Sequence, residues 1–211
     1  MPDFRLCLIT DRTQTAGRPL PAVVAAALAG GVKAVQLREK DMPDPELLSL
    51  AWELRDLTGH HGARLLINGR VDIALAVGAD GVHLGISTLG VAEARRLLGP
   101  DRLIGYSAHG VAEAERAAAA GADFVTLGPV YHTPSKAAYG PPTGLTLLGE
   151  AARRLTIPLF ALGGVKLSHV AEVMSAGAYG IALISPIISA PDPEQAAMTM
   201  LKAIESHVAT T

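Results

Sequence analysis

A regular alternation of short apolar runs and longer helix-like segments constrains the fold of this chain most strongly. The apolar runs are rich in Val, Ile and Leu, whereas the segments between them carry Ala, Glu and Arg with a helical period. Most of the runs are apolar almost throughout, which is typical of parallel strands covered on both faces. We therefore predict about eight parallel strands, at 6–11, 34–39, 64–69, 81–85, 103–108, 124–130, 158–164 and 179–187.

Glycine recurs where a helix-like segment meets the next strand, at 29–32, 77–81, 120–123 and 176–179. Helices often end at a glycine, so each junction fits one repeat of a strand and a helix. The repeats fill the chain without a linker, and they predict one domain, residues 1–211, of the α/β class, folded as a single (β/α)8 barrel, or TIM barrel. The alternative is an open doubly wound sheet, but the glycine fingerprint that should open its first helix does not follow Asp11.

Composition and charge exclude several classes of partner. The chain has 18 Lys and Arg against 20 Asp and Glu, and no basic run is long enough to bind nucleic acid or an anionic membrane surface. The longest uncharged apolar stretch, 20–32, is shorter than the roughly 20 residues of a spanning helix, and the first residues do not read as a signal peptide. We expect a soluble cytoplasmic protein in which the single cysteine, Cys7, is a core residue.

The end of the second predicted strand carries an unusual set of polar side chains. In barrels of this kind, catalytic groups lie at the carboxyl ends of the strands. Two cations and an amide that converge on the barrel mouth predict an anionic ligand, the alternative being that the cations only extend to solvent at the rim. The period of two divides the strand between two faces, with Gln36, Arg38 and Lys40 on one and Val35, Leu37 and Glu39 on the other.

Further polar groups lie at the ends of the next three strands, where Asn68, His83, Ser107 and His109 are expected near the same mouth. A lone histidine is more often structural than catalytic, so His83 alone would indicate little.

The loops after strands six, seven and eight predict where a phosphate binds. Residues 131–144 form a long polar loop rich in Gly and Pro, which is typical of a lid or ligand clamp, although a plain surface loop is the alternative. Gly163, Gly164 and Ser185 follow the last two strands, where barrels often bind phosphate through backbone N–H groups. The predicted ligand is a small phosphate ester lying across the mouth.

Several of these motifs together resemble the thiamine phosphate synthase and thiazole tautomerase superfamily. The resemblance covers nearly the whole chain and implies a (β/α)8 barrel that acts in making thiamine phosphate. The motifs that carry it are Leu8-Ile-Thr-Asp11, Gln36-Leu-Arg-Glu-Lys40, Leu66-Ile-Asn68, Gly81-Val-His-Leu-Gly85, Thr133-Pro-Ser-Lys136, Ala161-Leu-Gly-Gly164 and Ser185.

The synthase branch of this superfamily joins a pyrimidine methyl diphosphate to a thiazole phosphate and releases diphosphate, whose charge magnesium screens. The resemblance implies three groups of binding residues: Gln36, Arg38, Lys40, Asn68 and Ser107 for the pyrimidine and diphosphate, Thr133, Ser135 and Lys136 for phosphate groups, and Gly164 and Ser185 for the thiazole phosphate.

The chain departs from the synthase pattern at the two aspartates that carry magnesium. Gly69 and Thr88 stand at these positions, and they are poor replacements because magnesium prefers carboxylate oxygens. Asp72 could in principle reach the mouth, but we expect it to favour the amino terminus of the next helix. No metal is therefore expected. The run 68–75 is also similar to the tautomerase branch, which needs no cofactor, so the resemblance favours a thiazole phosphate tautomerase.

Such an isomerase moves a proton to aromatise a carboxy-thiazole phosphate, and it needs a general acid or base. The best-described tautomerase has a catalytic histidine directly after the glycine that ends strand six, where this chain has Pro129. The candidate catalytic residues are His132, which we prefer, His109, His83 and Lys40, the last of which could also face the substrate carboxylate with Arg38.

Two alternatives stay open at this point. One is a transferase, a thiamine phosphate synthase with relocated metal ligands and magnesium as its cofactor. The other is a regulator without catalytic activity that binds thiazole or thiamine phosphates. In each case the partner is a small phosphate ester such as thiazole phosphate, and the family implies a homodimer.

Overall fold

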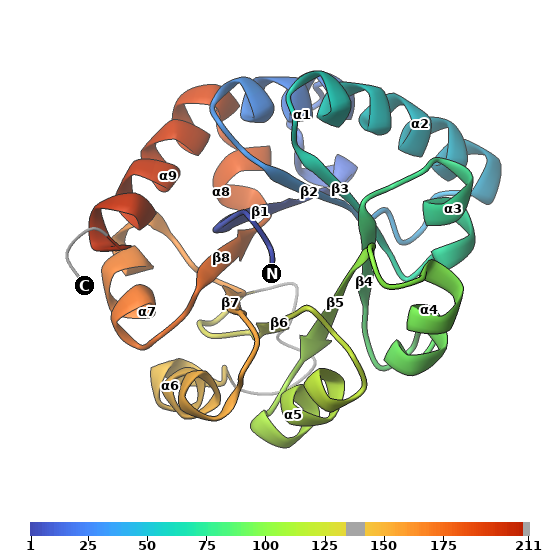
Figure 1. The fold of residues 1–211 in the computed structure, drawn as a ribbon. Helices are drawn as coiled ribbons and strands as arrows, with labels where there is room; N and C mark the ends of the chain where they lie inside the picture. Colours follow the sequence, from blue (N-terminus) through green and yellow to red (C-terminus); the bar gives the residue numbers. More distant parts are fainter. Residues whose placement is uncertain (134–141, 209–211) are drawn as a thin grey trace.

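Eight parallel strands close into a barrel in sequence order, and helices surround it (Figure 1). The computed structural model describes residues 1–133 and 142–208. The strands are β1 (Leu6–Ile9), β2 (Ala34–Leu37), β3 (Arg64–Asn68), β4 (Gly81–Leu84), β5 (Leu103–Ala108), β6 (Phe124–Leu127), β7 (Leu159–Leu162) and β8 (Gly180–Leu183). The predicted α/β class and TIM barrel are confirmed.

The main helices follow the strands in alternation. They are α1 (Leu20–Ala29), α2 (Asp44–His60), α3 (Val71–Ala76), α4 (Val91–Leu98), α5 (Val111–Ala119), α6 (Gly144–Arg154), α7 (Val170–Ser175), α8 (Ser185–Ile188) and α9 (Pro193–Val208), with short 3₁₀ turns η1 (Arg12–Gln14) and η3 (Leu167–His169). The predicted eighth strand, 179–187, was too long at both ends. Its last residues form α8, whose first turn accepts Pro186 because that turn needs no N–H from its first residues.

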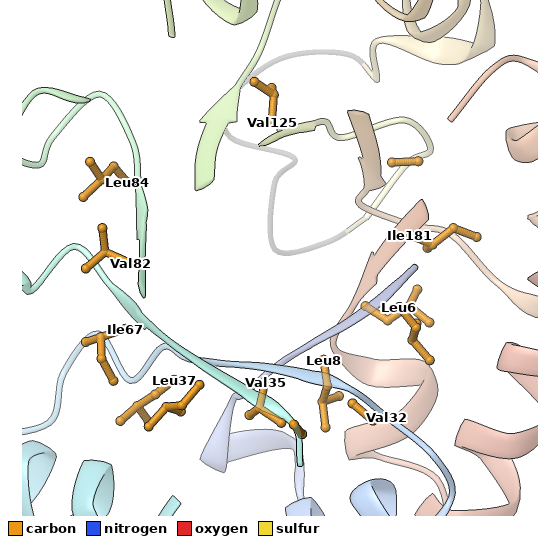
Figure 2. Close-up of a cluster of buried hydrophobic side chains, with 14 of the residues drawn as sticks. Leu6, Leu8, Val32, Val35, Leu37, Ile67, Val82, Leu84, Val125 and Ile181 are labelled. Atoms are coloured by element: carbon orange, nitrogen blue, oxygen red, sulfur yellow. The ribbon is translucent and has the colours of Figure 1, made fainter. Parts of the chain in front are cut away.

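The strands place alternate side chains in two separate cores. Leu8, Val35 and Leu37 lie on the side of β1 and β2 that faces the helices (Figure 2), within the outer core between the barrel and its helices. Cys7 and Ile9, of opposite parity on β1, belong to the core inside the barrel. Cys7 is fully buried, so it is a core side chain as expected, and this burial raises the pKa of its thiol to about 12.

The three phenylalanines of the chain meet inside the barrel. The rings of Phe4, Phe124 and Phe160 lie with centroids 5.4–5.8 Å apart, in the edge-on and tilted arrangements that aromatic rings prefer. Phe4 comes from the amino terminus, which lies at the centre of the barrel in Figure 1. Gly105 and Gly180 make room for this cluster, because a methyl group at either position would overlap the ring of Phe124 or Phe160. The cluster fills the barrel interior near its amino-terminal end.

Aspartates at two of the glycine junctions join neighbouring strands. Asp80 accepts a hydrogen bond from the backbone N–H of Leu65 at 2.9 Å and pairs with Arg55. Asp123 accepts one from the N–H of Ile104 at 2.7 Å and pairs with Arg95 at 2.6 Å. These carboxylates therefore satisfy strand N–H groups at the end of the barrel where the strands begin.

Within the described part of the chain, no helix combines the length and apolar character that crossing a membrane requires.

Candidate active site

A cavity of about 690 Å³ opens at the carboxyl ends of the strands. Every one of the eight strands, or the loop directly after it, contributes to its lining. The lining residues are Ile9, Asp11, Gln14, Gln36, Arg38, Lys40, Asn68, His83, Ser107, His132, Thr133, Leu162, Gly163, Gly164, Val165, Lys166, Ala182, Leu183, Ile184, Ser185 and Pro186.

Most of the residues expected at the mouth are brought together here, although their contacts with a ligand stay predictions. Of the expected set, His109 is not among the lining residues. Its ring lies 3.6 Å from the carboxylate of Glu113, and its backbone N–H donates to the same carboxylate at 2.8 Å. Ser135 and Lys136 lie outside the described residues.

β2 and the residues after it present their side chains with the predicted alternation. Gln36, Arg38 and Lys40 face the cavity, whereas Glu39 is buried behind it. Gln36 is only 1% exposed, and its Nε2 has no hydrogen-bond partner, unlike every other buried side-chain nitrogen or oxygen of the described residues. Since a buried donor is normally paired, this amide is available to an acceptor on a ligand.

His83 lies deep in the cavity wall, where it is only 3% exposed. Its Nε2 is 3.3 Å from the hydroxyl of Thr126, and its ring packs against Phe124. Burial lowers the pKa of His83 to about 4, and the positive charge of Arg38 acts in the same direction. The imidazole is therefore neutral at pH 7 and can accept or donate a hydrogen bond, but it is not an imidazolium acid.

The two glycines after β7 lie so close to the loop after β6 that a larger residue would overlap it. Both have positive φ, 92° at Gly163 and 69° at Gly164. A methyl group on Gly163 would lie 2.6 Å from Cα of Pro129, and one on Gly164 would lie 2.7 Å from the carbonyl oxygen of His132. The chain after β6 thus packs directly on the turn after β7, which brings His132 to the cavity.

Sequence reasoning missed three charged or polar lining residues, Asp11, Gln14 and Lys166. Asp11 ends the first predicted strand, so the rule that located the other residues could have found it. Its carboxylate accepts hydrogen bonds from the N–H and hydroxyl of Thr13 at 3.0 and 2.6 Å and from Nε2 of Gln14 at 2.6 Å. Burial alone would raise the pKa of Asp11, but these bonds and the charge of Arg38 hold it below its usual value.

The side chains present do not fit a magnesium ion held by protein carboxylates. Among the described residues, Asp11 is the one acidic residue that lines the cavity, and both of its oxygens already accept hydrogen bonds. Gly69 offers no side chain, and the hydroxyl of Thr88 is bonded to the backbone of Gly85. In the described ranges, no group of three or more His, Cys, Asp or Glu side chains could hold a metal.

Asp72 does not replace the missing carboxylates. It pairs with Arg70 at 2.7 Å, and the same guanidinium binds Asp44 at the start of α2. The hydrogen bond from Arg70 is the main cause that lowers the pKa of Asp72. This carboxylate is therefore committed to an ion pair outside the cavity, in the first turn of α3.

Comparisons with known proteins identify the family. The profile of the family described as "Thiamine monophosphate synthase" matches residues 6–187. A protein of Geobacter sulfurreducens, named provisionally as a thiamine-phosphate synthase, is 59% identical over 94% of this chain and 93% of its own. The thiamine-phosphate synthase of a Roseiflexus species is 44% identical over 94% of this chain and 84% of its own. The solved thiamine phosphate pyrophosphorylase from Pyrococcus furiosus superposes with a TM-score of 0.89, at 34% identity and 97% coverage of both chains.

These findings correct our functional prediction. The superfamily was identified correctly, but the expectation of a tautomerase, and so of an isomerase, is wrong, because the relatives bear the name of the synthase, a transferase. That expectation rested mainly on Gly69 and Thr88, which stand where the synthase pattern has two aspartates. The lack of two metal ligands is no evidence for proton-transfer chemistry, and Pro129 stands where the tautomerase branch has its histidine.

Proposed function

Since the chain belongs to the thiamine monophosphate synthase family, we propose that it joins a pyrimidine methyl diphosphate to a thiazole phosphate, forming thiamine phosphate and releasing diphosphate. The observation that carries this proposal is the composition of the cavity at the barrel mouth. Cations and amides from β2 and β3 lie opposite a glycine-rich turn after β7, so two anionic groups have separate places to bind. The volume of about 690 Å³ is in the usual range for small-molecule sites.

The reaction needs positioning and charge balance more than proton transfer. The bond between the pyrimidine methylene carbon and the diphosphate oxygen breaks, and its electron pair leaves with diphosphate. The lone pair of the thiazole nitrogen then forms the new carbon–nitrogen bond, and no proton has to move. A neutral His83 is compatible with this chemistry, because the work of the site is to orient the two substrates and exclude water.

We assign the charge of the leaving diphosphate to Arg38 and Lys40, which line the cavity after β2. Lys166, after β7, faces the same cavity and is assigned to the thiazole phosphate together with Gly163 and Gly164. Cationic side chains that are already in place stabilise a negative charge as it develops. No magnesium ion held by carboxylates of the free protein is part of this proposal.

The direct test supplies both substrates and measures thiamine phosphate by chromatography. We expect product that depends on both substrates. No product at saturating substrates, together with calorimetric binding of thiazole phosphate, would instead support the regulator without catalytic activity.

A titration of magnesium into the free protein tests the assignment of charge. We expect no heat of binding at millimolar magnesium, because the described residues contribute one carboxylate, Asp11, to the lining. Stoichiometric binding to the free protein would contradict it. The homodimer and the lack of nucleic-acid partners stay predictions, which sedimentation can check.

A further inference from the structure

The loop after β1 is bonded to the end of β2 beyond the last strand residues. The N–H of Thr10 donates to the carbonyl of Gln36, and the N–H of Arg38 donates to the Thr10 hydroxyl, each at 2.9 Å. The N–H of Arg12 donates to both carboxylate oxygens of Glu39, at 3.2 and 3.1 Å, and the Arg12 guanidinium donates to the same carboxylate at 3.1 Å. These bonds hold the loop after β1 against the residues that follow β2.

Glu39 is the centre of this arrangement. Its side chain is 2% exposed, and its carboxylate forms an ion pair with the guanidinium of Arg12. A buried carboxylate is stable only when it is paired and hydrogen-bonded, so the position of Arg12 is tied closely to that of Glu39. The charge-assisted bond to a backbone N–H fixes the main chain of the loop itself.

Both ends of the connection carry residues that line the cavity. Asp11 and Gln14 flank Arg12 in the loop, and Arg38 and Lys40 flank Glu39 in sequence. A movement of Glu39 would therefore displace cavity residues on both segments, although Glu39 itself does not line the cavity.

We propose that Glu39 is a positioning residue, which holds the loop after β1 and the cations after β2 in the geometry that binds diphosphate. The identity of the ligand rests on the proposed function. Glu39 touches no substrate, and it acts through the backbone of Arg12 and through its own neighbours in the chain.

A purely structural role is the competing explanation, and the barrel contains a matched control. Asp123 is also a carboxylate that accepts a strand N–H and pairs with an arginine, but it lies at the opposite end of the barrel. Loss of either carboxylate should lower the melting temperature. Loss of Glu39 alone should change the binding of an anion at the mouth.

The experiment compares Glu39→Ala, Glu39→Gln and Asp123→Ala by thermal melting and by calorimetry with inorganic diphosphate. We expect Glu39→Ala to weaken diphosphate binding about tenfold, as for one lost charge-assisted bond. Glu39→Gln keeps an acceptor for the Arg12 N–H, so it should recover part of this loss, and it also serves if the alanine variant does not fold. Asp123→Ala should melt earlier but bind diphosphate within about twofold of the wild type.

Equal diphosphate affinities in the wild type and both Glu39 variants would overturn the proposal, as would an equal loss of affinity in Asp123→Ala. The outcome is separate from that of the synthase assay. A protein that binds diphosphate only with Glu39 intact, yet makes no thiamine phosphate, would refute the proposed function and leave the role of Glu39 standing.

Discussion

The unpaired amide of Gln36 leads to a prediction in which stability and binding change in opposite directions. Its Nε2 is buried and has no hydrogen-bond partner among the described protein groups, and an unsatisfied buried donor costs about 1–3 kcal/mol. A substrate that places an acceptor beside Nε2 removes this cost on binding. We therefore expect the ligand-free protein to be less stable than it would be with an apolar side chain of the same shape at this position.

Gln36→Met is the substitution that tests this, because methionine has nearly the same length and no donor. We expect the empty variant to melt higher, by about 2–4 °C for each kcal/mol recovered in a domain of this size. Substrate affinity should fall by the same free energy, about 5- to 150-fold. Leu66→Met is the matched control: Leu66 pairs with Gln36 on β3 and is apolar, so its exchange should change both quantities little.

Thermal melts of the empty proteins and calorimetry with each substrate alone measure the two effects separately. The substrate whose affinity falls is the one that Gln36 contacts. A variant that melts several degrees lower while binding both substrates normally would refute the reasoning, since it would mean that the amide is already satisfied in the empty protein.

Three further predictions concern the cavity and its floor. The free energy of unfolding should fall by about 3 kcal/mol as the pH drops from 6.5 to 4, because in this window the unfolded chain binds a proton at His83 and the folded protein, with a pKa of about 4, does not. Denaturation of His83→Gln should show a smaller dependence of this free energy on pH, and an unchanged dependence would contradict the prediction. Lys166→Ala should raise the KM for thiazole phosphate about tenfold, whereas Lys202→Ala on α9 should not; equal effects would contradict the assignment. Gly105→Ala should lose about 1–3 kcal/mol in urea denaturation, because its methyl group would overlap the Phe124 ring; a loss within the usual scatter of surface substitutions would refute this.

Strand periodicity was sufficient to predict which side chains of β2 and the residues after it face the candidate site. It placed Gln36, Arg38 and Lys40 on one face and Glu39 on the other, and the structure has this arrangement. The reason is local: in an extended chain the direction of a side chain is fixed by its parity, and the carboxyl ends of parallel strands meet at one mouth.

The same rule failed at His109, although it held for the residues just beyond β2. His109 has the parity of Ser107 and follows the end of β5 at Ala108, but its ring lies beside the Glu113 carboxylate and does not line the cavity. Lys166 lies beyond two glycines with positive φ, where strand parity no longer indicates a direction. The contact between Phe4 and Phe124 joins residues far apart in the sequence, and only the closed barrel brings them together.

The error about the reaction has an electrostatic explanation. Two carboxylates and one magnesium ion carry equal and opposite charge, so a site that lacks all three has the same net charge as one that holds them. The described lining still carries Arg38, Lys40 and Lys166 against Asp11 alone, which is a positive mouth for an anionic leaving group. The lack of aspartates at positions 69 and 88 was therefore no reason to abandon diphosphate chemistry. The two reactions differ in the need to move a proton, but the described lining includes His132 as well as the buried, neutral His83, so the histidines do not choose between them. The names of the relatives do, and they favour the synthase.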